Sequence, residues 1–382
     1  MPKDEVVNNP VPVSWRGGIK LRRSRSYIIF LSILALLLSS CLAGCNKEKP
    51  QETAAPAEPG MRTIVDMAGR EVSVPEQINK VFSTNPPGTI LLYTMDPDLL
   101  IAWNYYLGEA EKKFILPQYH ELPNLGGWMA KTTCNTEELL KIGPDLILYM
   151  GDINDMSKSQ ADNIQKQVNI PVVMVNGDLT KMDETYGFTG KLLNMEKQAE
   201  LLGSYCRETV KQVQTKSKNI AEDKRVRVYY AEGASGLETD PCGSRHTEVL
   251  DMVGGVNVAD VIAKGERGMT QVSHEQVLLW NPDLIICWGQ CFKEIFSDTK
   301  WQNIKAAQDK KVYMVPSGPF NWFDRPPSVN RILGLKWLGN LLYPEVYAYD
   351  IAKETREFYQ KFYHYDLTDE DITFLLKDSG GK

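Results

Sequence analysis

The chain contains an internal repeat, and this repeat restricts the possible folds more than any other feature. Residues 136–151 and 274–289 share one order of apolar and polar positions, a Pro-Asp pair and a closing glycine. Each copy predicts a short amphipathic helix that stops at the proline, followed by an apolar run without polar alternation. Such a run is typical of a parallel strand that is buried on both faces. The repeat therefore predicts two α/β lobes.

Other segments fit the same pattern. A hairpin is predicted over residues 63–75, with its turn at Ala68 and Gly69. Further strands are predicted at residues 80–83, 99–103, 171–175, 225–231 and 311–315, and further helices at residues 247–252 and 329–342.

A long amphipathic helix is predicted between the two lobes. Apolar residues recur there at spacings of three and four, and no proline interrupts the segment. These apolar positions are Leu192, Met195, Ala199, Leu202, Cys206, Val210 and Val213. From residue 195 to residue 218, at about 1.5 Å per residue, the helix would extend over about 36 Å, which is enough to link two lobes side by side.

The fold class that follows is α/β, with two Rossmann-like lobes of mostly parallel sheets bridged by one long helix. We assign residues 61–181 to the N-terminal lobe, residues 182–222 to the linker helix region, and residues 223–382 to the C-terminal lobe with the C-terminal helices. Two such lobes create a cleft at their interface, because ligands bind beyond the carboxyl ends of parallel strands.

The N-terminal segment predicts export. A basic stretch at residues 20–25 precedes an apolar run at residues 27–38, which is shorter than the roughly 20 apolar residues that a membrane-spanning helix needs. Leu-Ala-Gly-Cys follows at residues 42–45. We interpret residues 1–45 as a lipoprotein signal peptide that ends at a lipidated cysteine, Cys45.

Two consequences follow from this signal. Cys41 also fits a lipid-attachment pattern, but Cys45 leaves a longer apolar segment and has glycine before the cleavage point. Residues 46–60 are polar and rich in proline, alanine and glutamate, which predicts a flexible tether. The mature protein is therefore expected outside the cytoplasm, anchored to the cell membrane by lipid.

The composition excludes several function classes. Hydrophobic residues make up 43% of the chain and charged residues 24%, which is typical of a globular protein. A formal net charge of -6 argues against binding to nucleic acid, which needs a basic face. The chain lacks a Gly-x-Ser-x-Gly elbow, a Gly-x-x-x-x-Gly-Lys loop and a His-Glu-x-x-His helix, so an exported enzyme is only a remote alternative.

Five cysteines follow the predicted signal peptide, at residues 134, 206, 242, 287 and 291. Their odd number and irregular spacing do not indicate a disulfide scaffold. Cys287 and Cys291 are separated by three residues rather than two, which argues against a redox or zinc motif. A disulfide between these two residues and two free thiols are both open at this point.

Taken together, these motifs resemble the substrate-binding lipoproteins of ABC importers for iron-siderophores, haem and vitamin B12. The resemblance rests on residues 63–72, on the repeated Pro-Asp-Leu-Ile, and on residues 254–259 and 272–277. It implies two lobes joined by a single helix, as in the helical-backbone metal receptors. It also implies a monomeric receptor without a cofactor that serves a permease dimer with ATPase subunits.

In such proteins one exposed glutamate on each lobe docks onto the permease. The equivalent positions of the repeat assign this role to Glu137 and Glu275. Two carboxylates related by lobe symmetry suit a permease of two subunits. The alternative is that both are ordinary solvated charges on a helix.

The loops that follow the strands should line the cleft. They carry the candidate ligand-binding residues Asn85, Trp128, Arg245, His246, Trp288, Trp322, Phe323 and Arg325. Guanidinium groups pair with carboxylate, catecholate, hydroxamate or oxyanion oxygens, and aromatic rings offer flat contact to a chelate. The alternatives for Arg325 are an ion pair with Asp324 or a cap on the helix that follows Pro326 and Pro327. The alternative for Trp322 and Phe323 is a packed loop plug.

The resemblance favours a metal chelate as the cargo, with a ferric siderophore first and haem or a corrinoid next. Molybdate or tungstate is the alternative, because some members of this family bind these oxyanions. A bare-metal site would need several imidazoles and carboxylates together, and the chain has only four histidines. His246 is the one candidate that could complete the coordination sphere of a metal chelate.

Overall fold

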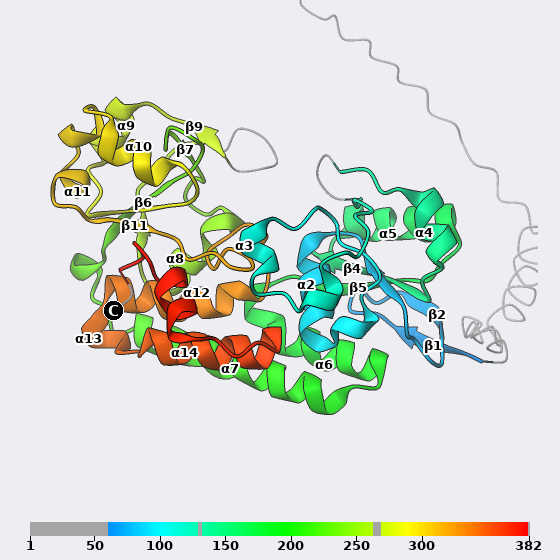
Figure 1. Ribbon diagram of the computed structural model, residues 1–382. Coiled ribbons are helices and arrows are strands. Elements are labelled where there is room, and N and C mark those ends of the chain that lie inside the picture. Colours follow the sequence, from blue (N-terminus) through cyan, green and yellow to red (C-terminus); the bar gives the residue numbers. More distant parts are fainter. Residues whose placement is uncertain (1–59, 129–131, 263–268, 381–382) are drawn as a thin grey trace, which may run out of the picture. The chain divides into compact units, whose positions relative to one another are not determined.

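The computed structural model describes residues 60–128, 132–262 and 269–380 (Figure 1). The predicted signal peptide, Cys41, Cys45 and almost all of the tether lie outside these residues. In the part of the chain that the structure describes, no helix is both long enough and apolar enough to cross a membrane.

The N-terminal lobe begins with the predicted hairpin, formed by β1 (Met61–Val65) and β2 (Glu71–Pro75). The buried carboxylate of Asp66 holds its turn, because it accepts hydrogen bonds from the backbone N–H groups of Ala68 and Arg70 at 3.0 and 2.9 Å. The same carboxylate accepts from the N–H of Met174 at 3.1 Å, which attaches the hairpin to the main sheet.

The main sheet of this lobe is parallel, with the order β3-β4-β5. Its strands are β3 (Val81–Ser83), β4 (Leu146–Gly151) and β5 (Val172–Asn176), as the apolar runs predict. The helices of the lobe are α2 (Pro86–Met95), α3 (Glu109–Lys112), α4 (Thr136–Ile142) and α5 (Asp155–Val168), with short 3-10 helices at Pro97–Leu99 and Pro117–Tyr119.

The strand predicted at residues 99–103 is wrong. The carboxylate of Asp96 caps a 3-10 turn at Pro97–Leu99, because it accepts from the N–H of Asp98 at 3.0 Å. After this turn the chain makes isolated bridges only, from Leu100 to Val81 and from Trp103 to Asn124. The polar cap therefore overrides the β-propensity of the apolar residues.

The C-terminal lobe contains a four-stranded parallel sheet with the order β11-β10-β6-β8. Its strands are β6 (Arg227–Ala231), β8 (Val256–Asn257), β10 (Leu284–Cys287) and β11 (Val312–Met314). A small antiparallel pair is formed by β7 (Glu238–Thr239) and β9 (Thr270–Gln271). The helices are α8 (Glu248–Met252), α9 (His274–Trp280), α10 (Cys291–Ser297) and α11 (Lys305–Gln308), with 3-10 helices at Glu222–Lys224, Arg245–Thr247 and Trp301–Asn303. The two parallel sheets confirm the predicted fold class.

The repeat forms the same unit in both lobes, α4 with β4 and α9 with β10. The aspartate of each Pro-Asp pair explains why the motif recurs. The carboxylate of Asp145 accepts from the N–H groups of Asn79 and Lys80 at 2.7 and 2.9 Å, at the start of β3. The carboxylate of Asp283 accepts from the N–H of Arg227 at 2.9 Å, at the start of β6. Each aspartate thus fixes the loop before its strand to the neighbouring strand.

Two helices connect the lobes, α6 (Met182–Leu193) and α7 (Glu196–Ser217). Asn194 lies between them in the left-handed region with a φ of 58°, so Leu192 belongs to α6 rather than to the long helix. The long helix α7 itself is confirmed. It contacts α2 and α6 as well as α8, α12 (Asn330–Leu342) and α13 (Pro344–Tyr347), and it therefore joins both lobes (Figure 1).

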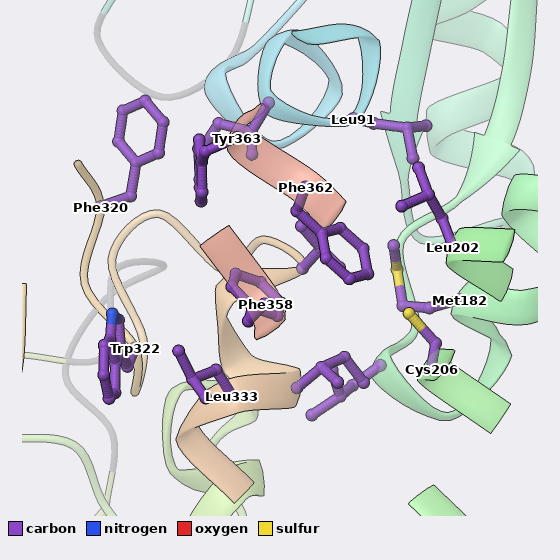
Figure 2. Close-up of a cluster of buried hydrophobic side chains, with 14 of the residues drawn as sticks. Leu91, Met182, Leu202, Cys206, Phe320, Trp322, Leu333, Phe358, Phe362 and Tyr363 are labelled. Carbon is purple, nitrogen blue, oxygen red and sulfur yellow. The ribbon is translucent and has the colours of Figure 1, made fainter. Parts of the chain in front are cut away.

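The C-terminal helices pack against α12 and against the N-terminal lobe. They are α14 (Ile351–Phe358), a π-helical turn at Tyr359–Tyr363, and α15 (Asp369–Leu375). Figure 2 shows Phe358 and Phe362 between Leu202 and Cys206 on one side and Leu333 on the other. The ring of Phe362 stacks on that of Phe358, with 4.3 Å between the ring centroids. It meets the ring of Tyr205 edge-on, with a centroid distance of 5.5 Å.

The sequence assigns these helices to the C-terminal lobe, but their side chains also contact the N-terminal lobe. The ring of Tyr363 lies 6.0 Å from that of Tyr93 in α2, and Lys113 forms a 2.9 Å ion pair with Asp371. One hydrophobic core is continuous across both lobes and the linker as a result. A core that both lobes share restricts how far they can separate.

Candidate ligand cleft and docking surfaces

A cavity of about 410 Å³ lies between residues of the two lobes. It is lined by Asp152, Asp178, Gly243, Ser244, Arg245, Glu248 and Asp251. Asp152 directly follows β4 and Asp178 lies just beyond β5, whereas the other residues precede or belong to α8. The cavity thus lies at the carboxyl ends of parallel strands, where the sequence predicts the cleft.

Arg245 crosses this cavity from the C-terminal lobe. Its Nη1 donates to the carboxylate of Asp152 in the N-terminal lobe. Gly177 permits the approach, because a Cβ atom there would lie 3.3 Å from Nη2 of Arg245 and 3.2 Å from the Cα of Gly151. The guanidinium therefore lies against Gly177 and ties the lobes together.

A second arginine, Arg331, also links the two lobes at this point. The buried Arg331 of α12 donates from Nη1 to Glu248 at 2.8 Å and from Nη2 to the carbonyl oxygen of Gly177 at 3.4 Å. Its position brings another guanidinium to the N-terminal lobe, but one that Glu248 already neutralises.

The cavity is acidic. Four carboxylates line it. Arg245 pairs with Asp152 and the buried Arg331 pairs with Glu248, so the excess negative charge rests on Asp178 and Asp251. Partial burial, with a smaller contribution from the nearby carboxylate of Glu248, raises the pKa of Asp251 to about 6. A carboxylate whose ionised form is disfavoured mainly by burial is stabilised by a ligand with positive charge.

Arg325 does not line this cavity. Its Nε lies 3.0 Å from Glu232 and 3.0 Å from Asp324, and its Nη2 donates to Asp240 at 2.7 Å. The carboxylates of all three acids are buried. The ion pair with Asp324, considered above as one alternative for Arg325, is therefore present, together with two partners that the sequence did not indicate.

His246 lies beside this cluster, because its Nδ1 contacts the carboxylate of Asp324. One ligand atom each of Asp240, His246 and Asp324 lie within 4.8 Å of one another, which is close enough to hold a metal ion. The guanidinium of Arg325, however, contacts carboxylate oxygens of Asp240 and Asp324. In this arrangement the guanidinium takes the place that a cation would need.

The carboxyl of Glu232 holds its proton more tightly than an exposed glutamate does. Burial and its hydrogen bond with Asp240 raise the pKa of Glu232 to about 9. A protonated Glu232 reduces the excess of buried negative charge around Arg325.

This raised pKa predicts a pH-dependent stability. The carboxyl of Glu232 loses its proton near pH 4.5 in the unfolded chain, but keeps it up to about pH 9 in the folded protein. Between these values the folded state binds more protons, so the free energy of unfolding should fall as the pH rises. In Glu232→Gln we expect urea denaturation to show a smaller fall between about pH 5 and about pH 9 than in the parent. Exposed Glu222→Gln is the control, and equal slopes for the parent and Glu232→Gln would contradict the assignment.

The structure does not bring the remaining candidates together in the cavity. Asn85 is buried and caps α2, because its Oδ1 accepts from the N–H of Gly88 at 3.1 Å and its Nδ2 donates to the carbonyl of Met150 at 2.6 Å. Trp322 and Phe323 are fully buried, which corresponds to the packed loop plug. Trp128 and Trp288 are half-buried.

Two close contacts explain why the loop with Trp322 and Phe323 packs into the interior. The ring of Phe323 meets Tyr230 at 4.7 Å. The carbonyl oxygen of Trp322 approaches α12 so closely that a Cβ atom on Gly334 would lie 1.8 Å from it. Glycine at position 334 is therefore required for this loop to pack.

Sequence reasoning missed the acidic residues of the cavity. A signal for two of them was present, because a Gly-Asp pair stands at the carboxyl end of both neighbouring strands, at residues 151–152 and 177–178. The glycines allow close approach, and the aspartates then stand at the same edge of the sheet. Glu248 and Asp251 carried no comparable signal.

The described cysteines are free thiols, including Cys287 and Cys291. Both of these residues are buried, and the Sγ of Cys291 lies 3.2 Å from the carbonyl oxygen of Trp288. The sequence left open whether Cys287 and Cys291 form a disulfide. In this structure both are free thiols.

Glu137 and Glu275 occupy equivalent positions, each the second residue of its helix, in α4 and α9. Both are exposed. The carboxylate of Glu137 lies 3.1 Å from Nζ of Lys141. The backbone N–H of Glu275 itself and the hydroxyl of Ser273 lower the pKa of the Glu275 carboxyl.

Comparison with known proteins agrees with this architecture. Residues 116–319 match the family described as periplasmic binding protein. A solved solute-binding protein of an ABC transporter from Sulfurospirillum deleyianum superimposes with a TM-score of 0.77 at 34% identity, over 83% of this chain and 99% of that chain. The chain belongs to the periplasmic binding protein family. It is the substrate-binding protein of an ABC importer, an extracytoplasmic transport component rather than an enzyme, and such proteins work with a permease and an ATPase.

Relatives with assigned ligands differ from one another. The chain is 27% identical to the molybdate-binding protein MolA of Haemophilus influenzae over 333 residues, which is 79% of this chain and 91% of MolA. The structure of MolA bound to molybdate superimposes with a TM-score of 0.64 at 25% identity, over 80% of this chain and 99% of MolA. The vitamin B12-binding protein of Salmonella typhi is 25% identical over 271 residues, 69% of this chain and 90% of that protein.

Proposed function

We propose that this substrate-binding protein captures a compact metal chelate in the cavity between its lobes, and that the chelate is a ferric siderophore of the hydroxamate class. The observation that carries this proposal is the charge of the cavity, where Asp178 and Asp251 add negative charge beyond the two ion pairs of Arg245 with Asp152 and of Arg331 with Glu248. The volume of about 410 Å³ suits a small ligand, since ligand sites commonly enclose about 300–1,000 Å³.

Charge separates the classes of chelate. Three hydroxamates neutralise a ferric ion, and an amine on the chelator makes the complex positive, whereas three catecholates leave it strongly negative. Haem carries two carboxylates, which the acidic wall would repel, and a corrinoid is large for this cavity. Among the chelates that the family resemblance suggests, a ferric hydroxamate therefore fits the described cavity best.

Molybdate or tungstate is the second candidate, and the similarity to MolA favours it. In that case Arg245 would leave Asp152 and donate to the oxyanion instead. The carboxylates of Asp178 and Asp251 oppose this use of the cavity, because a doubly charged anion would lie among like charges.

We propose that ligand binding shifts the protein toward a closed state. A ligand that contacts both lobes stabilises closure by its differential affinity for the closed form. Arg245 and Asp152 form part of the closing contact, and the core shared by both lobes keeps the swing small.

The mature protein is proposed to be a monomer that a lipid, such as palmitate, on Cys45 anchors to the membrane through the tether at residues 46–60. Glu137 and Glu275 are proposed to dock onto the permease. Their matched positions on α4 and α9 and their exposure support this role.

Tryptophan fluorescence tests the ligand class. The soluble chain from residue 46 onward would be titrated with a ferric hydroxamate, a ferric catecholate, haemin, a corrinoid, molybdate and tungstate. We expect saturable quenching by the ferric hydroxamate, because the half-buried Trp288 directly follows β10, at the carboxyl end of its sheet, where ligands of such lobes bind. A response to molybdate or tungstate alone would replace the chelate proposal by the oxyanion one.

Removing negative charge from the cavity should change the affinities for the two candidate ligands in opposite directions. Asp178→Asn with Asp251→Asn keeps the shape of both side chains, and asparagine can still accept the hydrogen bond that Asp178 receives from the N–H of Thr180 at 2.9 Å. We expect about tenfold weaker binding of a positive ferric hydroxamate in a calorimetric titration. An oxyanion receptor would bind molybdate more tightly after the same change. Exposed Glu208→Gln with Glu222→Gln, which removes equal charge elsewhere, should change neither affinity.

A further inference from the structure

The two proposed docking helices also expose apolar side chains. Leu140 in α4 is 52% exposed, and Leu278 in α9 is 46% exposed. The repeat places these two leucines at equivalent positions, three residues after Glu137 and Glu275 respectively. Residues three apart on a helix are neighbours on its surface. Each lobe therefore presents a carboxylate beside an exposed leucine.

This exposure does not follow from the amphipathic pattern of the helices. The preceding residues of the repeat, Leu139 and Val277, are both fully buried and supply the apolar side of their helices. Single exposed leucines are common on protein surfaces, so either leucine alone would indicate nothing. The repetition at one equivalent position in both lobes is what indicates a shared partner.

The next position of the repeat differs between the lobes. In α4 it is Lys141, whose Nζ lies 3.1 Å from Glu137 and 3.6 Å from Glu138. In α9 it is Leu279, which is 83% exposed. The carboxylate of Glu137 is thus partly neutralised by its own helix, whereas α9 adds a second leucine beside Glu275.

We propose that each lobe docks onto the permease through a glutamate and a neighbouring leucine, and that Glu275, Leu278 and Leu279 of the C-terminal lobe form the stronger contact. The inference rests on the proposed docking role of the two glutamates. It commits to one occupant, a permease whose two subunits each present a basic side chain next to an apolar pocket. In Figure 1, α4 and α9 lie on the sides of their lobes that face away from α7. The linker helix α7 therefore covers neither of them.

Charge and apolar contact have separate roles in this arrangement. The glutamates steer the encounter and fix the orientation, and their effect weakens with salt. The leucines bury apolar area in the complex, which slows dissociation. Lys141 competes with the basic group of the permease for Glu137, and this competition reduces the contribution of the N-terminal lobe.

The test measures binding of the purified protein, without added ligand, to the permease and ATPase complex reconstituted in lipid nanodiscs, by surface plasmon resonance. We expect Leu278→Gln with Leu279→Gln to weaken binding about tenfold, mainly through faster dissociation, and Leu140→Gln to weaken it about threefold. Lys141→Leu gives α4 the residue that α9 has, and it should tighten binding about threefold. Leu201→Gln, at a 43% exposed leucine of α7, is the control and should leave binding unchanged.

The outcomes separate this inference from the docking proposal beneath it. If the leucine variants bind like the parent while arginine at Glu137 and Glu275 prevents binding, the glutamates dock and the leucine inference is wrong. If Leu140→Gln weakens binding more than Leu278→Gln with Leu279→Gln does, the C-terminal lobe does not make the stronger contact. Weaker binding of Lys141→Leu would also contradict this part of the proposal. If the arginine variant also binds like the parent, docking through α4 and α9 fails altogether.

Discussion

Arginine in place of both Glu137 and Glu275 is expected to abolish uptake of the cargo while leaving its affinity for the protein unchanged. Both carboxylates are exposed on the first turns of α4 and α9, outside the acidic cavity. Reversing both charges would set like charges against a basic permease surface, and like-charge contacts at an interface cost several kcal/mol, or about a hundredfold or more in affinity.

Uptake would be measured with radiolabelled ligand in cells, or in proteoliposomes that contain the importer, and affinity by fluorescence titration of the isolated protein. A protein with Glu208→Arg and Glu222→Arg has the same change in net charge at exposed sites outside α4 and α9, and it should support normal uptake. Normal uptake by the Glu137→Arg and Glu275→Arg protein would remove these residues from docking.

The second large effect is expected at Phe362. Its fully buried ring stacks on Phe358 (Figure 2), with 4.3 Å between the ring centroids. It also meets the rings of Tyr205 of α7 and Tyr186 of α6 edge-on, with centroid distances of 5.5 and 6.1 Å. Truncation to alanine would leave a cavity where the C-terminal helices meet the linker. The expected loss is about 3–5 kcal/mol in the free energy of unfolding.

Urea denaturation of the soluble chain measures this loss. Tyr106→Ala is the control, because Tyr106 is 84% exposed and its removal should change the free energy of unfolding by less than about 0.5 kcal/mol. Phe362→Leu keeps most of the buried volume and should fold even if the alanine variant does not, with a loss of about 1 kcal/mol. A loss below about 1 kcal/mol for Phe362→Ala would show that the lobes do not depend on this shared core.

Local patterns explain which elements of the fold could be predicted from the sequence. Helix period, proline placement and unbroken apolar runs act over a few neighbouring residues, so both copies of the repeat and the long helix α7 were predicted correctly. The error at residues 99–103 has the same origin, because a short apolar run cannot reveal that Asp96 caps a turn just before it.

The amino-acid sequence by itself determined the α/β class, the two lobes and the matched positions of Glu137 and Glu275, because each of these depends on spacing along the chain. Only the tertiary structure decided that Arg325 pairs with Glu232 and Asp240, that Asp152 meets Arg245 across the cavity, and that the C-terminal helices join both lobes. These features depend on which distant residues become neighbours after folding. Charge pairing and burial act through space, so spacing along the chain cannot predict them.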